Sequence, residues 1–154
     1  KASCCVRPLI LVLGAAEMSS AQKLAAAWVN FYSVEHPRGS DRTQASKRYL
    51  DAEVAAFELV DTVRDNPELA WSAIIEVLRI TDNDWVIGNL AAGPLEDLLW
   101  LHGPSFIDRV ENESRQSRRF ALAFQGVWQL GDGNAEVWAR VRALQEAGAA
   151  DGGA

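Results

Sequence analysis

Apolar residues recur at intervals of three and four along most of this chain, and that spacing restricts the folds available to it. In the segment that follows Pro67, for example, Ile74 and Val77 fall on one side and Glu76 on the other. Residues with this spacing share one face of an α-helix. No segment shows the sustained apolar/polar alternation of a half-buried strand. The sequence therefore predicts an all-α fold.

Capping and helix-breaking residues divide the pattern into about seven helices. Asn66 and Asn134 are placed to cap two of them, and Thr81 with Asp84 resembles a capping box. Pro94 lies inside the fourth helix, so we expect either a kink near Leu90 or a division at Gly93-Pro94. Gly103-Pro104 is expected to end that helix after His102 and to open the fifth.

Short loops between these helices favour antiparallel pairs. The stretch from Asp82 to Leu99 is similar to a HEAT-type repeat helix, and a compact irregular bundle is the alternative. The helix predicted from about Ser46 to Asp65 has a broad apolar side, which we expect to face the core. Its members are Leu50, Val54, Phe57, Val60 and Val63.

The length of 154 residues fits one domain, which we place at residues 18–147. Residues 1–17 precede the first methionine, Met18, and are predicted to be a leader or another extension. The apolar run from Leu9 to Ala16 is far shorter than the ~20 residues of a membrane-spanning helix. The small and polar residues 148–154 are predicted to be a flexible tail.

Charge and composition restrict the classes of partner. Fifteen basic and 21 acidic residues give a net charge of −6, which opposes binding to nucleic acid and to anionic membranes and favours a basic protein partner. Cys4 and Cys5 are adjacent and cannot form a disulfide framework, which favours a reducing, cytoplasmic setting. There is no strand followed by a glycine-rich loop and no G-x-S-x-G motif, so we expect neither a cofactor nor a serine nucleophile.

The first candidate site is a polar helix face formed by Glu96, Asp97 and Trp100. The helical spacing places these residues away from the apolar stripe that includes Leu95 and Leu98. We expect the two carboxylates to be hydrated. A large aromatic side chain such as Trp100 needs cover from another helix or from a partner.

His102 is the second candidate. It could cap its helix, or it could bind a transition metal or act as an acid or base with Glu96, Asp97 or Asp108. No H-E-x-x-H or related spacing accompanies it, so the pattern favours the structural role and predicts no metal site. Asp108 itself lies on a helix where Arg109 and Glu113 can form an ordinary surface pair.

Arg118 and Arg119 form the third candidate, because they begin a predicted helix. Positive charge at a helix N-terminus opposes the helix dipole. We therefore expect these two side chains to meet Glu111, Glu113 or an external anion.

Four short motifs connect the chain to a known domain family. They are LAAGPLEDLL at residues 90–99, His102-Gly103, FIDRVE at residues 106–111 and GVW at residues 126–128. With these motifs, about half of the chain resembles an uncharacterised bacterial helical domain family, a domain of unknown function. The resemblance implies a helical, bacterial, cytoplasmic protein and carries over no catalytic residue.

Two classes of function follow from these patterns. The leading hypothesis is a small acidic protein-interaction module that presents Glu96, Asp97 and Trp100 to a basic partner. An immunity-type protein that neutralises a basic toxin would be one such module. The alternative is a metal-dependent or acid/base enzyme centred on His102, which requires His102 and at least two carboxylates to converge in a pocket.

Overall fold

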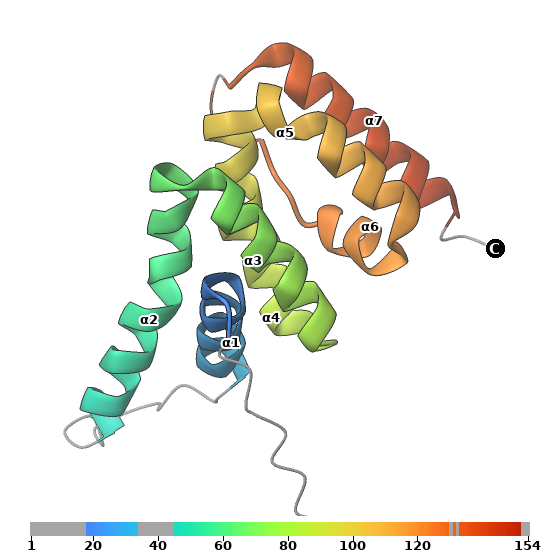
Figure 1. Cartoon of the computed structure of the whole chain (residues 1–154). Helices are drawn as coiled ribbons and strands as arrows, with labels where there is room; N and C mark the ends of the chain where they lie inside the picture. The colour runs from blue at the N-terminus through green and yellow to red at the C-terminus, as the bar shows by residue number, and fades with distance from the viewer. Residues whose placement is uncertain (1–17, 34–44, 130, 132, 152–154) are drawn as a thin grey trace, which may run out of the picture.

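A computed structural model describes residues 18–33, 45–129, 131 and 133–151, and these residues form helices and connecting turns without any strand (Figure 1). The all-α prediction is therefore confirmed. None of the helices in these ranges has both the length and the hydropathy to cross a membrane. The helices are α1 (Ser20–Ser33), α2 (Ala45–Asp65), α3 (Pro67–Ile80), α4 (Asp84–Leu90), α5 (Glu96–Gln116), α6 (Arg118–Phe124) and α7 (Ala135–Asp151), with a π-helical segment, η1 (Ala91–Leu95), between α4 and α5.

The predicted domain limits fall at the edges of these ranges. The proposed extension, residues 1–17, lies outside the described residues. Helix α7 continues past Gly148, where we predicted the tail to begin, as far as Asp151.

Side-chain caps begin the helices at three of the predicted places. Asn66 accepts a hydrogen bond from the Leu69 N–H, and Asn134 accepts one from the Val137 N–H. The cap of α4 is Asn83 rather than Thr81, because the Asn83 side chain accepts bonds from the first turn of α4 while Thr81 accepts one from the Asn83 N–H. These caps satisfy N–H groups that have no partner inside the helix.

Helices α4 and α5 follow one another through η1 without a loop and form one helical rod, which bends within α5 (Figure 1). Pro94 therefore neither splits the helix nor ends it, because the wider π-helical turn accommodates the proline within the backbone. The predicted boundary at Gly103-Pro104 is wrong, since α5 passes through both residues. Proline has no N–H, so one carbonyl group of the preceding turn loses its hydrogen-bond partner. Pro104 is exposed, so water can bind that carbonyl group.

Helix α1 packs between α2 and α3, beside α4 (Figure 1). Trp28 is its buried centre. The Trp28 Nε1–H points to the carbonyl oxygen of Val86 at 3.4 Å, and the far edge of the ring lies against Gly93 in η1. The first helix is thereby joined to the rod at the π-helical turn.

The C-terminal half is built on aromatic contacts and on a close helix approach. Trp71 of α3 packs against Phe106 of α5 and Phe120 of α6, with ring centroids 6.1 and 5.7 Å apart. Helices α5 and α7 lie side by side (Figure 1). They approach at Gly103, where an added Cβ would lie 2.7 Å from the Val137 Cγ1.

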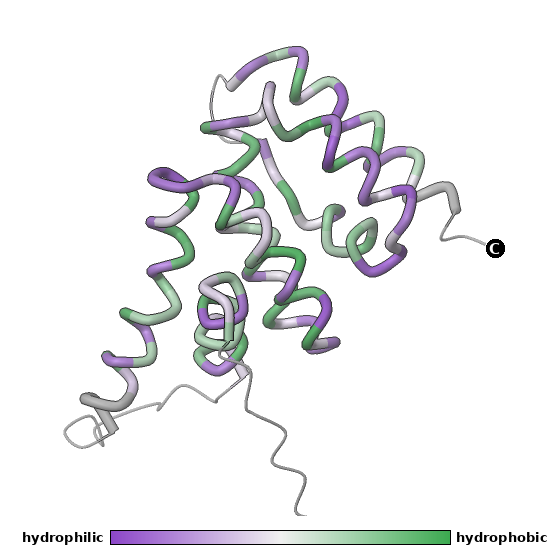
Figure 2. Tube along the Cα trace, in the orientation of Figure 1, coloured by the Kyte–Doolittle hydropathy of each residue, from purple (hydrophilic) through white to green (hydrophobic). Residues whose placement is uncertain are grey.

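The structure corrects the apolar side that was predicted for residues 46–65, which belong to α2. Val63 is buried as expected, together with Ala56 and Leu59, but the other members of that side are not all buried. Apolar and hydrophilic residues alternate along the coloured part of α2 in Figure 2, and the neighbouring helices cover only part of its circumference. The residues left outside the core are Leu50, Val54 and Phe57.

Two glycine substitutions test this packing. We expect Gly103→Ala to destabilise the protein by about 1–3 kcal/mol through overpacking against Val137, offset only in part by the ~1 kcal/mol of helix propensity gained. Gly88→Ala gains the same propensity, and its Cβ would meet no atom within 4 Å, so it should stabilise. Urea unfolding of both variants measures the difference. A Gly103→Ala protein as stable as Gly88→Ala would contradict the close approach of α5 and α7.

Candidate functional site

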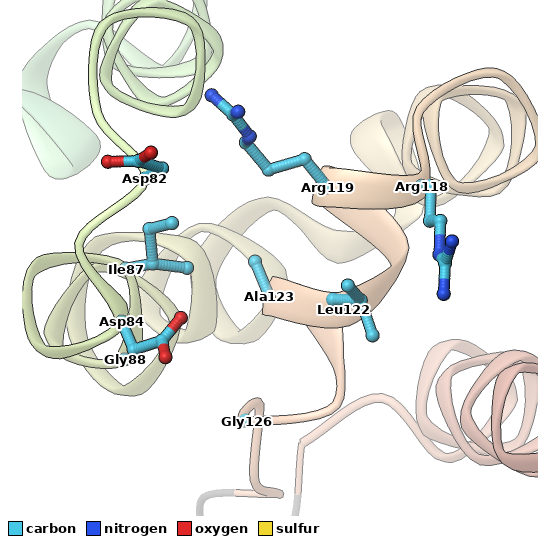
Figure 3. A pocket seen from close by; sticks show the side chains of 9 residues that line it. All are labelled: Asp82, Asp84, Ile87, Gly88, Arg118, Arg119, Leu122, Ala123 and Gly126. Carbon is cyan, nitrogen blue, oxygen red and sulfur yellow. The ribbon is translucent and has the colours of Figure 1, made fainter. Parts of the chain in front are cut away.

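An open groove lies between α4 and α6, with a volume of about 510 Å³ (Figure 3). Ile87 on α4 and Ala123 on α6 face one another across it, and Gly126 closes one end. Leu122 lines its outer edge and is 64% exposed. Apolar concave surfaces of this kind are where proteins bind ligands and partner side chains.

The α4 wall carries two acidic residues because of the way its helix begins. Asn83 caps the helix through hydrogen bonds of 3.0 Å and 3.3 Å from the N–H groups of Trp85 and Val86. Asp82 and Asp84 flank that cap, where the positive end of the helix dipole favours negative charge. Both side chains are exposed and line the groove. From the sequence, Asp84 was expected only to form a capping box with Thr81.

The α6 wall carries Arg118 and Arg119, the predicted basic pair. The Arg119 Nη1 donates hydrogen bonds to the carbonyl oxygens of Leu78, at 2.8 Å, and of Thr81, at 3.1 Å. These carbonyls lie at the C-terminal end of α3, which carries the negative end of its dipole. Arg119 therefore meets carbonyl oxygens at the end of α3, and not Glu111 or Glu113.

Arg118 differs from its neighbour. It is exposed, forms no ion pair with the described part of the chain, and extends in a different direction from Arg119, although both line the groove (Figure 3). Ser117 caps the helix by accepting a hydrogen bond from the Phe120 N–H at 3.1 Å. The groove thus has acids at one wall and a free guanidinium at the other.

The groove stays open beside Gly88, which has no side chain to fill it. A Cβ added there would meet nothing within 4 Å, although the residue is in the middle of α4. A glycine inside a helix can mark a close approach of helices or a helix end, but Gly88 faces open space in the middle of α4. No side chain from the rest of the described residues fills the space beside Gly88, so the groove extends to this part of α4.

The predicted polar face at Glu96 is not a hydrated one. Glu96 is only 5% exposed, and its Oε2 accepts a hydrogen bond of 2.9 Å from the Trp128 N–H. Burial raises the pKa of the Glu96 carboxyl, the Trp128 N–H opposes the rise, and the nearby charge of Asp97 adds to it. Our expectation failed because a segment 32 residues further along the chain covers this face.

The other two candidates from α5 are only partly covered. Burial raises the pKa of Asp97, and the guanidinium of Arg64 partly offsets the rise. Trp100 lies against Gly133 and remains 49% exposed. Asp97 and Trp100 therefore keep some access to solvent, whereas Glu96 does not.

His102 lies in the middle of α5 rather than at a helix end. Its Nε2 is buried without a hydrogen-bond partner, and the imidazole meets the edge of the Phe106 ring with centroids 6.5 Å apart. Nowhere in the described ranges do three His, Cys, Asp or Glu side chains form a group that could hold a metal ion. The convergence required by the enzyme hypothesis is therefore not found.

Asp108 belongs to a surface network rather than to a pocket. Arg140 of α7 donates to Asp108 and to Glu111 at 2.6 Å each. Arg109, expected to pair with Glu113 on its own helix, instead reaches Glu68 of α3 at 2.6 Å. These ion pairs connect helices and leave Asp108 outside the groove.

A pH-dependent stability measurement tests the buried carboxylate. Because the pKa of Glu96 is raised on folding, folding favours its protonated form. The resulting stabilisation is full below the unfolded pKa of about 4.3 and is lost as pH rises through the folded pKa. Glu96→Gln can still accept the Trp128 N–H, so at pH 7 it should be at least as stable as the wild type.

The matched variant is Glu96→Ala, which leaves the Trp128 N–H unsatisfied and should cost about 1–3 kcal/mol. Urea unfolding at pH 7 and pH 4 compares the three proteins. Equal losses in both variants at pH 7 would show that the negative charge, and not the hydrogen bond, holds the segment.

Comparison with known proteins adds a family and no activity. A family model described as "Family of unknown function (DUF6869)" matches residues 43–149. No curated protein and no solved structure matches the chain.

Proposed function

Because the chain belongs to the Family of unknown function (DUF6869), whose description gives no activity, we propose a function from the site itself. It is a protein-interaction module that takes an apolar side chain from a basic segment of a partner into the groove between α4 and α6. The role of an immunity-type protein, with a basic toxin as the partner, belongs to this class.

The observation that carries the proposal is an unfilled apolar groove with hydrated carboxylates at its edge. Leu122 and Ile87 offer apolar contact area, and Gly88 leaves room for an incoming side chain. Burying one Leu- or Phe-sized side chain there contributes about 1.5–3 kcal/mol.

Charge determines which partner suits the groove. Asp82 and Asp84 form no ion pair with the described residues, so they are available to lysine or arginine side chains next to the apolar anchor. The net charge of −6 adds attraction at longer range. These features support an acidic interaction surface at the start of α4. The sequence had instead suggested one at Glu96 and Asp97.

Selection from a displayed peptide library tests the proposal. We expect enriched peptides to combine one large apolar residue with neighbouring Lys or Arg residues. Gly88→Trp should fill the groove and weaken their binding by at least about tenfold, a change of ~1.4 kcal/mol. Asp82→Lys should weaken it as well.

Ala139→Trp is the matched control, because Ala139 is exposed on α7 and does not line the groove. Peptides that bind Gly88→Trp as tightly as the control protein would refute the groove as the binding site. NMR shift mapping would then locate the true one.

A further inference from the structure

The outer face of α2, defined by Leu50, Val54 and Phe57, is an apolar stripe outside the core. These side chains are 53%, 72% and 45% exposed. They follow one another at intervals of four and three, so they share one face over two turns of the helix. Single exposed apolar residues are ordinary, but a contiguous stripe marks an interaction site.

The opposite side of the helix already supplies the packing that holds α2 in place. Ala56, Leu59 and Val63 are fully buried there, against α1 and α3. Phe57 is the one aromatic residue of the stripe, and its ring contacts the core. Its centroid lies 6.4 Å from that of Phe31. The outer face is therefore not needed to attach α2 to the protein.

Acidic side chains border the stripe. Asp51, Glu58, Asp61 and Asp65 are exposed and form no ion pair within the described ranges. Arg64 is an exposed basic residue near the end of the helix, and its charge acts on Asp97 of α5. Their helical positions place Asp51, Glu58 and Asp65 on one side of the apolar residues and Asp61 in line with them.

These charges select among the possible occupants. Helix α2 carries five acidic and three basic residues, so a second copy of it would bring like net charge against like. Anionic lipid surfaces and nucleic acids are repelled for the same reason. An amphipathic helix with an apolar stripe and flanking Lys or Arg residues complements both the shape and the charge of this face.

We propose that the outer face of α2 docks a basic amphipathic helix of a partner protein. The site is separate from the groove between α4 and α6, and the proposal does not depend on that groove being occupied. A protein with both surfaces can bind two segments of one partner, or two partners at once.

The probe is a synthetic helical peptide of about 18 residues, or five turns, with leucines on one stripe and lysines beside it. Its binding to the full chain is measured by fluorescence anisotropy. We expect Val54→Asp to weaken binding by at least about tenfold, although it adds negative charge. Attraction by charge alone would instead strengthen the binding of the cationic peptide to this variant.

Two further variants complete the test. Asp61→Lys should weaken binding and reduce its dependence on salt. The groove between α4 and α6 is proposed to bind a segment of the same chemistry, so the variants are compared in a Gly88→Trp background, in which the groove is filled. This separates the present proposal from the preceding one. Circular dichroism checks that each variant keeps its helices, and the exposure of Val54 makes its substitution harmless to the core.

Three results would overturn the proposal. The first is equal binding of the peptide to the wild type and Val54→Asp, or no binding to either. The second is loss of peptide binding in Gly88→Trp alone, which would place the peptide in the groove. The third is a wild-type dimer in sedimentation that Val54→Asp dissociates, which would show that a second copy occupies the face.

Discussion

The hydrogen bond from the Trp128 N–H to the buried Glu96 carboxylate determines how the C-terminal half is placed on the rod of α4, η1 and α5. It holds the segment between α6 and α7 against the rod. Gln145 of α7 holds the same segment from the other side through the carbonyl oxygens of Phe124 and Val127. An added Cβ at Gly126 would lie 3.3 Å from the Ala91 Cβ of η1, so a larger residue there would push the segment away. The place where this segment crosses the rod therefore sets the positions of α6, α7 and the groove.

Burying a carboxylate is costly, and the protein offsets the cost by using the group as an acceptor for a backbone donor that would otherwise be unsatisfied. The same principle explains Arg119. Its guanidinium, unfavourable at the start of its own helix, satisfies the last carbonyl groups of α3. Arg119 was conspicuous in the sequence because its charge disagreed with its predicted position, whereas Glu96 was expected on a hydrated face. In both cases the structure supplies a hydrogen-bond partner more than thirty residues away. Such residues shape the groove, and the proposed binding rests on Asp82, Asp84 and the apolar lining.

The two proposed binding surfaces share one chemistry. The groove and the outer face of α2 each combine exposed apolar area with hydrated carboxylates, and α2 and α6 lie on different sides of α3 (Figure 1). A basic, partly apolar partner therefore suits both. Trp100, which we expected to belong to the binding surface, lies beside Gly133 and outside the lining of the groove. His102 and Asp108 likewise belong to the packing and to the surface ion pairs, not to either surface.

The sequence by itself determined the all-α class, the caps at Asn66 and Asn134 and the start of α3 at Pro67, because helix periodicity and capping depend on residues within about four positions of one another. It also drew attention to Glu96, Asp97 and Arg119. It could not show that Glu96 is buried, that Val54 is exposed, or that the helix continues past Pro94 and Pro104. Those outcomes depend on which segments, tens of residues apart, pack together. Helical spacing gives the direction of each side chain around its helix, but only the tertiary structure decides which directions lead to the core and which to solvent.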